Sequence, residues 1–435
     1  MTKKVMMMSH GITGVTGFSN QLYLQSRALI EDGYEVYALH RDYRGEPIVF
    51  PRDCSAHTTG GRKLEGITFL PIGGQQWQWG EDVVPYYLQK YKIDYMHTLG
   101  DIWCYQYLRQ MPRIKTKWLA HYVFDTENIV GFWNECVAAA DISVVPSQNS
   151  FDMLTKAGHK NVKYVQHGID TNTYKPATFD EKMQFRDEIG IPRDAFVVGS
   201  VAHNQYRKMV YRLIDAFHAF LKINPKSLLV LHCLPKDSTG WDLPQIIKDR
   251  GLLNNIVFTD KAGKGIGDIH VPESEMRKFY CSMDIHALST GGEGFGVPIV
   301  EAMACGIPNV VTDYTTTKEF LTDKSVGDDG KDIYTNVRGI AVPITEIEVH
   351  HTGGIWAKIN TGLMTKAFAY LKDNDGEAKQ MGMKARKFAV ENYDNELVKT
   401  KWKELYKDFD AFVENVKNSE KGAENSLKIM RLPHG

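Results

Sequence analysis

The chain has 435 residues, which is longer than one ordinary hydrophobic core requires, so its length predicts two domains. Hydrophobic residues make up 43% and charged residues 24% of the sequence, the balance of a soluble globular protein. With a formal net charge of -1, the chain has no overall charge that would attract it to nucleic acid or to an anionic membrane. We therefore expect no nucleic-acid partner and at most peripheral contact with a membrane.

The cysteines and the apolar runs exclude further classes of protein. The six cysteines form no Cys-x-x-Cys pair and suggest no metal-binding quartet, which is typical of reduced, buried thiols in a cytoplasmic protein. The apolar run at residues 5–8 is too short for a signal peptide, and no run approaches the roughly 18 residues of a transmembrane helix. We therefore expect a cytoplasmic chain without a bound metal or a membrane span.

The beginning of the chain predicts a strand, a glycine-rich loop and a helix. The expected elements are a strand at 4–9, a loop at 10–18, a helix capped by Ser19 or Asn20 that ends at 32, and a strand at 34–39. The loop has the spacing G-x-x-G-x-x-G, with Gly14 and Gly17 as its second and third glycines. This differs from the dinucleotide fingerprint G-x-G-x-x-G, so NAD is not expected. A plain turn of an α/β sheet would explain the same glycines.

Further strands are expected at 93–99 and 117–123, and the segment 138–147 is expected to be the last strand of this half. His121 stands at the end of the second of these strands, near Asp125. Ligands of parallel α/β sheets bind beyond the carboxyl ends of the strands, so His121 is a candidate site residue. A structural histidine is the alternative.

Four aromatic residues lie close together in the sequence around Gly80: Trp77, Trp79, Tyr86 and Tyr87. Aromatic faces stack on sugar rings, so these residues could form a wall for an acceptor. The packing of a loop is the simpler explanation.

The pattern of strands and helices restarts in the second half of the chain. The expected elements are a helix at 179–190, a strand at 196–201, a helix at 211–223, a strand at 227–233, a glycine-rich loop at 260–273 and a helix at 273–281. The polar segment S-V-A-H-N-Q-Y-R-K at 200–208 ends in Arg207 and Lys208. Two halves of this kind predict an α/β protein built from two Rossmann-like domains.

The segment 289–308, S-T-G-G-E-G-F-G-V-P-I-V-E-A-M-A-C-G-I-P, follows an apolar strand at 285–288. Its glycines leave backbone N–H groups free to approach a ligand, and the helix that starts near Pro298 adds a partial positive charge. We expect Glu293 and Glu301 to bind sugar hydroxyls on either side of a phosphate. A glycine turn with Glu293 in solvent and Glu301 on an exposed helix face is the alternative.

Glu293 and Glu301, with the residues around them, resemble the E-x7-E motif of the retaining GT-B glycosyltransferases of family 4 (E-G-F-G-x-P-x-x-E-A-M-A-x-G-x-P). The resemblance implies a GT-B fold, in which two Rossmann-like domains face each other across a cleft. It places the acceptor side at 1–176 and the donor side at 177–392. For the remaining region, 393–435, it implies a helix at 393–413 that crosses back to the first domain, followed by a tail. It is strong in the second half and loose from about 40 to 115.

The same resemblance implies roles for the motif residues. Glu293 would contact the donor sugar, and Glu301 would bind the ribose of the nucleotide. The loop amides would face the sugar and the phosphate, at Gly294, Phe295, Gly296 and Val297. The loop at 260–273 would flank the base through its backbone, so its side chains do not predict which base is bound.

Residues outside the motif receive roles from the resemblance as well. Arg207 and Lys208 would neutralise the diphosphate, while His203 stands where family members often carry arginine, a departure that leaves its role open. His121 would face the donor sugar. The first glycine-rich loop, with Gly14 and Gly17, would lie beneath the donor phosphates.

We therefore expect a retaining glycosyltransferase that moves a sugar from a nucleoside diphosphate sugar, such as a UDP- or GDP-sugar, to a glycan, a lipid-linked or a small-molecule acceptor. No cofactor and no metal are expected, because Arg207 and Lys208 supply the positive charge. A GT-B epimerase, or a protein that binds nucleotide sugar without transferring it, would fit the same motifs. A sugar phosphorylase would need a pyridoxal lysine motif, which we do not find. The oligomeric state is not predicted.

Overall fold

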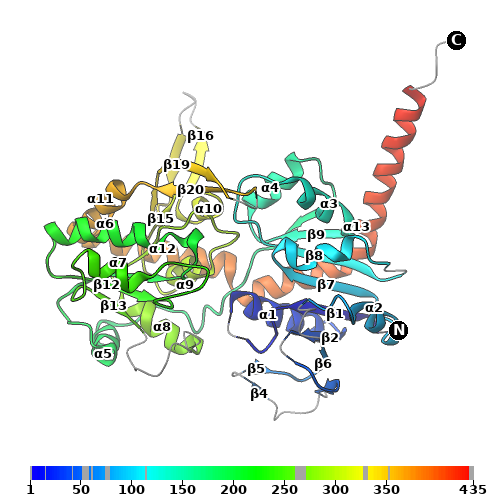
Figure 1. Cartoon of the computed structure of the whole chain (residues 1–435), viewed down its shortest axis with the longest axis horizontal. Coiled ribbons are helices and arrows are strands. Elements are labelled where there is room, and N and C mark those ends of the chain that lie inside the picture. Colours follow the sequence, from blue (N-terminus) through cyan, green and yellow to red (C-terminus); the bar gives the residue numbers. More distant parts are fainter. Residues whose placement is uncertain are drawn as a thin grey trace.

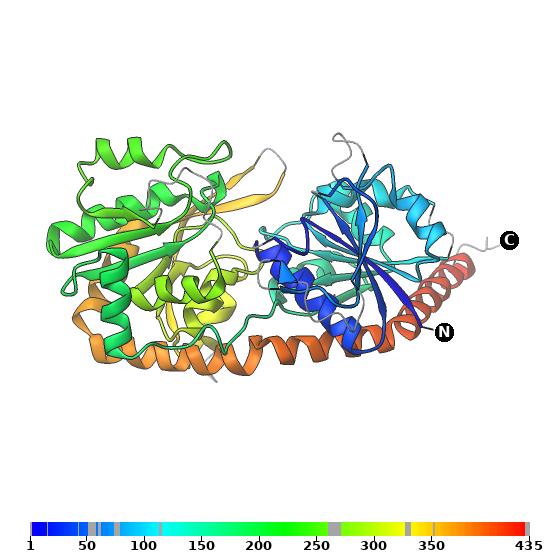
Figure 2. The same ribbon diagram turned by 90° about the horizontal axis from the view of Figure 1, so that it is seen from below.

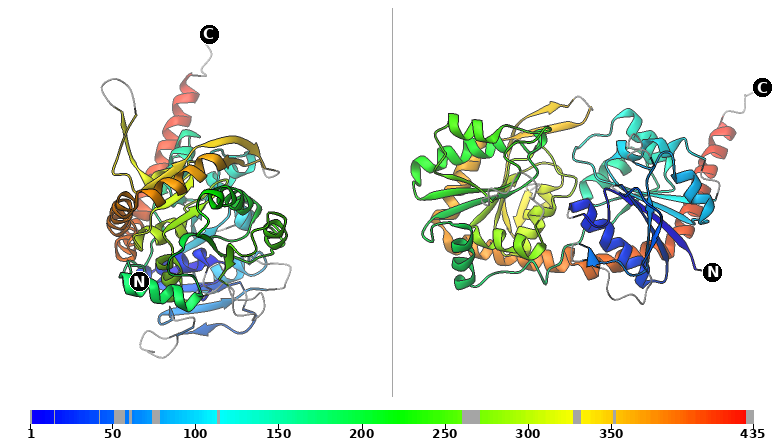
Figure 3. Two further views of the ribbon diagram at one scale, coloured as in Figure 1. Left: turned by 90° about the vertical axis from the view of Figure 1, so that its left-hand side faces the viewer. Right: turned by 60° about the horizontal axis from the view of Figure 1, so that its bottom comes forward.

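The computed structural model describes residues 2–14, 16–41, 43–50, 58–59, 62–73, 79–112, 115–259, 271–326, 332–350 and 353–430. Two α/β domains lie side by side, and a run of helices along one side of the molecule connects them (Figures 1 and 2). The mainly parallel sheets confirm the expected fold class. Two further views show the central sheet of each domain between its helices (Figure 3).

The first domain contains an eight-stranded sheet in the order β10-β9-β8-β7-β1-β2-β6-β3. Its strands are β1 (Lys4–Ser9), β2 (Glu35–His40), β3 (Ile48–Val49), β6 (Ile67–Pro71), β7 (Tyr95–Gly100), β8 (Lys117–Tyr122), β9 (Ile142–Val145) and β10 (Val162–Tyr164). All pairs are parallel except β3 with β6. A separate pair consists of β4 (Thr58–Thr59) and β5 (Arg62–Lys63). The strand order reverses between β1 and β7, which makes this the switch point of the sheet.

The helices of the first domain are α1 (Gly17–Glu31), α2 (Val84–Lys90), the 3₁₀ helix η1 (Ile102–Arg109), α3 (Gly131–Ala139) and α4 (Gln148–Lys156). The expectation that Ser19 or Asn20 caps α1 is wrong, since Thr16 is the cap and its side chain accepts the Ser19 N–H. Helix α1 therefore starts at Gly17, before both of the residues that were expected to cap it. The segment 138–147 is also not the last strand, because the chain adds β10 beyond β9 at the edge of the sheet.

The second domain contains a six-stranded parallel sheet in the order β13-β12-β11-β14-β15-β18. Its strands are β11 (Phe196–Val201), β12 (Ser227–His232), β13 (Ile256–Phe258), β14 (Ile285–Leu288), β15 (Asn309–Thr312) and β18 (Gly339–Val342). Apolar residues fill β11 on both faces, as a strand covered by helices on both sides requires. The switch point of this sheet lies between β11 and β14.

The helices of the second domain are α5 (Phe179–Ile189), the 3₁₀ turn η2 (Tyr206–Lys208), α6 (Val210–Ile223), α7 (Leu243–Asp249), α8 (Glu273–Ser282), α9 (Val297–Ala304), α10 (Thr317–Leu321), α11 (Thr361–Asp373) and α12 (Asp375–Tyr393). Two antiparallel hairpins add to this domain, β16 (Asp323–Val326) with β17 (Asp332–Thr335), and β19 (Ile344–Val349) with β20 (Ile355–Ile359).

A long helix, α13 (Asn395–Met430), returns to the first domain after a break at Asp394. The sequence predicted this helix at 393–413, but it begins two residues later, after the break, and is longer than expected. Its apolar face completes the core of the first domain, where Trp402, Tyr406 and Phe409 are almost fully buried. The five cysteines among the described residues are free and buried, as the sequence predicted. No helix in the described part of the chain has the length and apolar character needed to cross a membrane.

Candidate functional site

The loop after β14, at the switch point of the second sheet, meets the loop after β8 of the first domain. The segment 289–296 follows β14, and it packs against the end of β8 in the first domain. A Cβ atom on Gly292 would lie 2.0 Å from the carbonyl oxygen of Asp125, and one on Gly294 would lie 2.1 Å from Cγ1 of Val123. Glycine is therefore required at both positions, because a side chain would force the two domains apart.

A cluster of four charged side chains occupies this junction. Nζ of Lys208 lies 2.5 Å from Oε1 of Glu293, and Nε of Arg207 lies 2.6 Å from Oδ2 of Asp125. The guanidinium of Arg207 also lies 3.5 Å from Oε2 of Glu293 and donates a hydrogen bond to the carbonyl of Gly292. Two cations and two carboxylates thus alternate across the domain boundary, with Asp125 contributed by the first domain.

The charges in this cluster hold one another ionised. Burial acts to raise the pKa of Glu293, but Lys208 and Arg207 outweigh it and hold that pKa below its ordinary value. Burial acts to lower the pKa of Arg207, which Asp125 and Glu293 more than offset, so its pKa is raised. Burial lowers the pKa of Lys208 although Glu293 opposes the shift. Glu293, with only 5% of its surface exposed, is not the solvated residue of the alternative interpretation.

Neighbouring backbone and hydroxyl groups fix the loop that carries Glu293. The N–H of Glu293 donates to Oγ1 of Thr315 (2.9 Å), and Oγ1 of Thr316 donates to the carbonyl of Glu293 (2.9 Å). The N–H of Gly291 donates to the carbonyl of Arg207 (2.7 Å), which ties the acidic loop to the basic one. The position of Glu293 is therefore determined by contacts on both sides of it.

Helix α9 begins directly after this loop, as expected from Pro298 near its start. Gly296 adopts the left-handed conformation (φ 94°) that turns the chain into the helix at Val297. Cγ2 of Val297 would be 3.8 Å from a Cβ on Gly17, so the first glycine-rich loop meets the N-terminus of α9. The Phe295 side chain points the other way and packs on His167, Phe320 and Tyr393.

Glu301 lies on the second turn of α9 with its side chain turned inward. The hydroxyl of Tyr280 donates a hydrogen bond of 2.7 Å to Oε2 of Glu301. Burial raises the pKa of this carboxyl to about 7, with a further contribution from Glu273, although the hydrogen bond from Tyr280 opposes the shift. The alternative of an exposed Glu301 is therefore wrong, since the side chain is buried.

The raised pKa of Glu301 predicts a pH-dependent cost to stability. A carboxyl whose pKa is about 7 in the folded state and near 4.5 when unfolded binds more protons in the folded state, so stability falls as pH rises through that window. Glu301→Gln keeps an acceptor for Tyr280 and removes the titration. We expect the variant and the wild type to have similar free energies of unfolding at pH 4, and the variant to be more stable by up to about 3 kcal/mol at pH 8. Denaturant unfolding across this range measures the difference, and a constant difference would contradict the pKa.

His121 lies at the end of β8, with its ring turned into the interior of the first domain. The ring is fully buried, Nδ1 lies 3.2 Å from Nε2 of Gln25, and Nε2 has no hydrogen-bond partner among the described residues. His167 and Trp402 pack on it at ring-centroid distances of 5.1 and 5.2 Å. Burial, with His167 and His97, lowers the pKa of His121 well below the ordinary value. Its role toward a donor sugar stays a prediction.

Two other candidates have partners of their own. His203 is half-exposed, and its Nε2 lies 2.8 Å from Oδ2 of Asp237 rather than in the Arg207 cluster. Gly14 lies at a tight turn, where an added Cβ would be 2.6 Å from Oγ of Ser19. The roles expected for these residues are not decided by their contacts. The base-flanking loop at 260–273 lies outside the described residues from 260 to 270.

Sequence reasoning did not assign a role to two acids of the first domain. Asp125 contacts Arg207 directly, and Asp101 follows β7 at the carboxyl edge of the same sheet. Burial, together with the charge of Asp125, raises the pKa of Asp101 to about 7, although Arg207 opposes the shift. The one signal in the sequence is that each acid comes one to three residues after a buried strand.

The aromatic residues around Gly80 differ in how deeply they are buried. Tyr87 is buried in the core and Tyr86 is exposed, while Trp77 lies outside the described residues. Trp79 packs at 5.1 Å from the ring of His10 and at 5.5 Å from that of Tyr105, and the guanidinium of Arg41 lies 4.8 Å above it. Packing therefore accounts for Trp79 and Tyr87, whereas the exposed Tyr86 is not explained by it.

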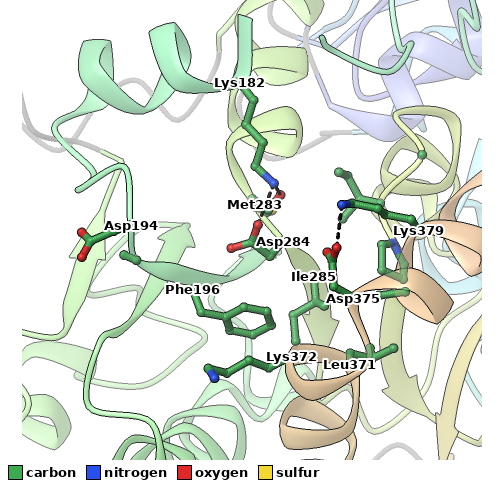
Figure 4. A pocket seen from close by; sticks show the side chains of 15 residues that line it. Lys182, Asp194, Phe196, Met283, Asp284, Ile285, Leu371, Lys372, Asp375 and Lys379 are labelled. Atoms are coloured by element: carbon green, nitrogen blue, oxygen red, sulfur yellow. Dashed lines mark hydrogen bonds and ion pairs between the residues drawn. The ribbon is translucent and has the colours of Figure 1, made fainter. Parts of the chain in front are cut away.

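A cavity of about 400 Å³ lies elsewhere, at the amino ends of β11 and β14 (Figure 4). Four of its charged groups pair with one another, Lys182 with Asp284 and Lys379 with Asp375. This cavity is at the sheet edge opposite the loops described above. In the described part of the chain, no three His, Cys, Asp or Glu residues are placed to hold a metal ion.

Comparisons with known proteins match this description. Residues 192–343 fit the model of the family described as "Glycosyl transferases group 1". The chain is 25% identical over 198 residues to the alpha-monoglucosyldiacylglycerol synthase of Acholeplasma laidlawii, covering 45% of this chain and 47% of that protein. It is 24% identical over 281 residues to the D-inositol 3-phosphate glycosyltransferase of Thermobifida fusca, covering 59% and 62%. The chain thus matches about half to three fifths of the length of these relatives.

Solved structures resemble the whole fold at low sequence identity. The sucrose-phosphate synthase of Thermosynechococcus elongatus has a TM-score of 0.71 at 16% identity, covering 94% of this chain and all of that one. HepE of Anabaena in complex with UDP-glucose has a TM-score of 0.66 at 15% identity, covering 93% and 99%. The expected GT-B fold is confirmed. The chain has a GT-B fold, and its segment 192–343, which contains Arg207, Lys208, Glu293 and Glu301, matches the model of the glycosyl transferases group 1 family.

Proposed function

We propose that this protein is a retaining glycosyltransferase that uses a nucleoside diphosphate sugar as donor. The proposal is supported mainly by the charged cluster at the junction of the two domains. There Arg207 and Lys208 form ion pairs with Glu293. A diphosphate needs cations, and a sugar needs carboxylates for its hydroxyls. Both kinds of group are present within one junction, next to the N-terminus of α9.

In the proposed reaction the bond between the anomeric carbon and the β-phosphate oxygen breaks. The oxygen of an acceptor hydroxyl bonds to that carbon on the same face of the sugar, and the hydroxyl proton passes to the leaving diphosphate. The leaving diphosphate gains negative charge as the bond breaks. Lys208 and Arg207, with the amides at the start of α9, would stabilise that charge. Because Glu293 and Asp125 already hold the two cations in place, little reorganisation is needed when the phosphate enters.

The comparisons support the choice of donor and leave a range of acceptors. HepE was solved with UDP and with UDP-glucose, and the two relatives are named as an alpha-monoglucosyldiacylglycerol synthase and a D-inositol 3-phosphate glycosyltransferase. We propose a UDP- or GDP-sugar as donor, a carbohydrate or glycolipid as acceptor, a cytoplasmic location and a reaction without a metal ion.

Binding of the bare nucleotide tests the donor site. UDP or GDP at 100 times its dissociation constant should add about 2.7 kcal/mol to the stability of the protein, measured as a thermal shift. We expect EDTA to leave this shift unchanged, because in this proposal Arg207 and Lys208, which pair with Glu293, supply the positive charge that a metal ion would otherwise provide. UMP and uridine serve as controls that lack the second phosphate or both. Loss of the shift in EDTA would contradict a metal-free site.

The competing functions differ in their products. An epimerase would release sugar without any acceptor, and a protein that only binds nucleotide sugar would release neither sugar nor UDP. Slow release of UDP from UDP-glucose would exclude the second of these. Transfer of labelled glucose to an added acceptor would exclude the first.

A further inference from the structure

The hairpin β19–β20 projects from the second domain toward the first (Figure 2). It is described at 344–350 and 353–359, after the last strand of the central sheet. Among the described strands, these two pair only with each other, so the hairpin is not required to complete the six-stranded sheet. Its two ends make different contacts, which together indicate what it does.

The tip of the hairpin is hydrogen-bonded to the first domain. The N–H of Ile355 donates to Oγ1 of Thr126 (2.8 Å) and to Oδ1 of Asn128 (3.0 Å), and Nδ2 of Asn128 donates to the carbonyl of Gly353 (2.9 Å). Thr126 is fully buried in this contact. A Cβ on Gly353 would lie 2.7 Å from a methyl carbon of Val130, so the backbone approaches as closely as it can.

The second strand of the hairpin is hydrogen-bonded to the loop of Glu293. The N–H of Ala357 donates to the carbonyl of Gly291 (2.9 Å), whose own N–H is bound by Arg207. A Cβ on Gly291 would lie 3.2 Å from Cβ of Trp356. Only Trp356 separates Ile355, held by the first domain, from Ala357, which holds Gly291. Gly291 is in turn two residues before Glu293.

We propose that β20 is a positioning element for Glu293, and that Thr126 and Asn128 are positioning residues that act through it. Contact with the first domain helps to fix Ile355, β20 transmits that position to Gly291, and the alignment of Glu293 thereby depends in part on the contact between the domains. The inference rests on the proposed function, because Glu293 is the predicted sugar contact. Like Asp125, Thr126 and Asn128 belong to the loop after β8, so one segment of the first domain holds both Arg207 and the hairpin.

Thr126→Val removes the hydroxyl with little change in volume, and Thr126→Ser restores it. A matched control is available at the next residue, since Glu127 makes an interdomain ion pair with Lys318 (2.6 Å) that does not touch the hairpin. We expect Thr126→Val to lower turnover of UDP-glucose on the order of fivefold, with little change in KM, as the loss of one buried hydrogen bond predicts. Thr126→Ser and Glu127→Gln should stay within about twofold of the wild type.

Amide hydrogen exchange supplies a readout that does not depend on activity. Thr126→Val, and likewise Asn128→Ala, should speed exchange at Gly291 and Glu293 as well as at Ile355, and Thr126→Ser should not. Faster exchange confined to the hairpin tip would overturn the proposal, and so would equal effects of Thr126→Val and Glu127→Gln. If the wild-type protein neither binds UDP nor turns over UDP-glucose, the proposed function fails, while the exchange comparison still decides whether the hairpin positions Gly291 and Glu293.

Discussion

Replacing Lys208 by alanine is expected to lower kcat at least 100-fold. A cation on the departing phosphate acts mainly as charge develops in the transition state, and the loss of one such group costs on the order of 3 kcal/mol. Arg207→Ala should have a smaller effect, because part of its guanidinium is already engaged by Asp125 and the carbonyl of Gly292. Steady-state kinetics with UDP-glucose measures both variants.

The comparison needs a control, because Lys208 also neutralises the buried Glu293 and its loss is expected to destabilise the fold. Thermal unfolding of each variant identifies that effect separately. Lys236→Ala removes an exposed lysine that pairs with Asp242, and it should change neither stability nor kcat. Equal and mild losses of kcat from Lys208→Ala and Arg207→Ala would place this loop away from the diphosphate.

Glu301→Gln is expected to impair binding of the nucleotide, and Glu293→Gln is expected to impair turnover. Glu301 is the predicted ribose partner, a contact present in both the ground state and the transition state, so its loss should weaken UDP and raise KM for the donor. Glu293 is the predicted sugar partner, so its loss should leave the affinity for UDP nearly intact and lower kcat. Calorimetry with UDP alone, beside kinetics with UDP-glucose, separates the two effects.

The isosteric change to glutamine preserves the shape of each site, but the two sites differ in charge. Glu293 is held ionised by Lys208, whereas Glu301, with a pKa of about 7, is half protonated near neutral pH. Binding of UDP should therefore be measured at pH 8, where Glu301 is mostly ionised. If Glu293→Gln weakens UDP as much as Glu301→Gln does, the assignment of the two acids is wrong.

The sequence predicted the sheets well because buried parallel strands leave an unmistakable pattern. The strand at 196–201 was predicted to the residue, since an apolar run covered by helices on both faces has clear ends. The cap of α1 was missed because Thr16, Ser19 and Asn20 are all chemically able to cap a helix. The two hairpins were missed because their strands are largely exposed and pair only with each other.

Contacts within one loop were predictable, and contacts between domains were not. The motif and the basic pair identify Glu293, Arg207 and Lys208, whose roles stay predictions. The pairing of Asp125 with Arg207 depends on how the two domains meet, which no local pattern records. The burial of His121 was not predictable either, because Trp402, which covers it, comes from a helix that is distant in the sequence.

That helix sets the order in which the protein can fold as it is synthesised. The sheet of the first domain is complete once β10 has left the ribosome, but the apolar face that Trp402, Tyr406 and Phe409 cover stays open until the last helix emerges. The second domain, whose strands and covering helices are contiguous, can fold before that moment. A nascent chain halted between the two stages would expose a large apolar surface, and it would be a substrate for chaperones or a seed for aggregation.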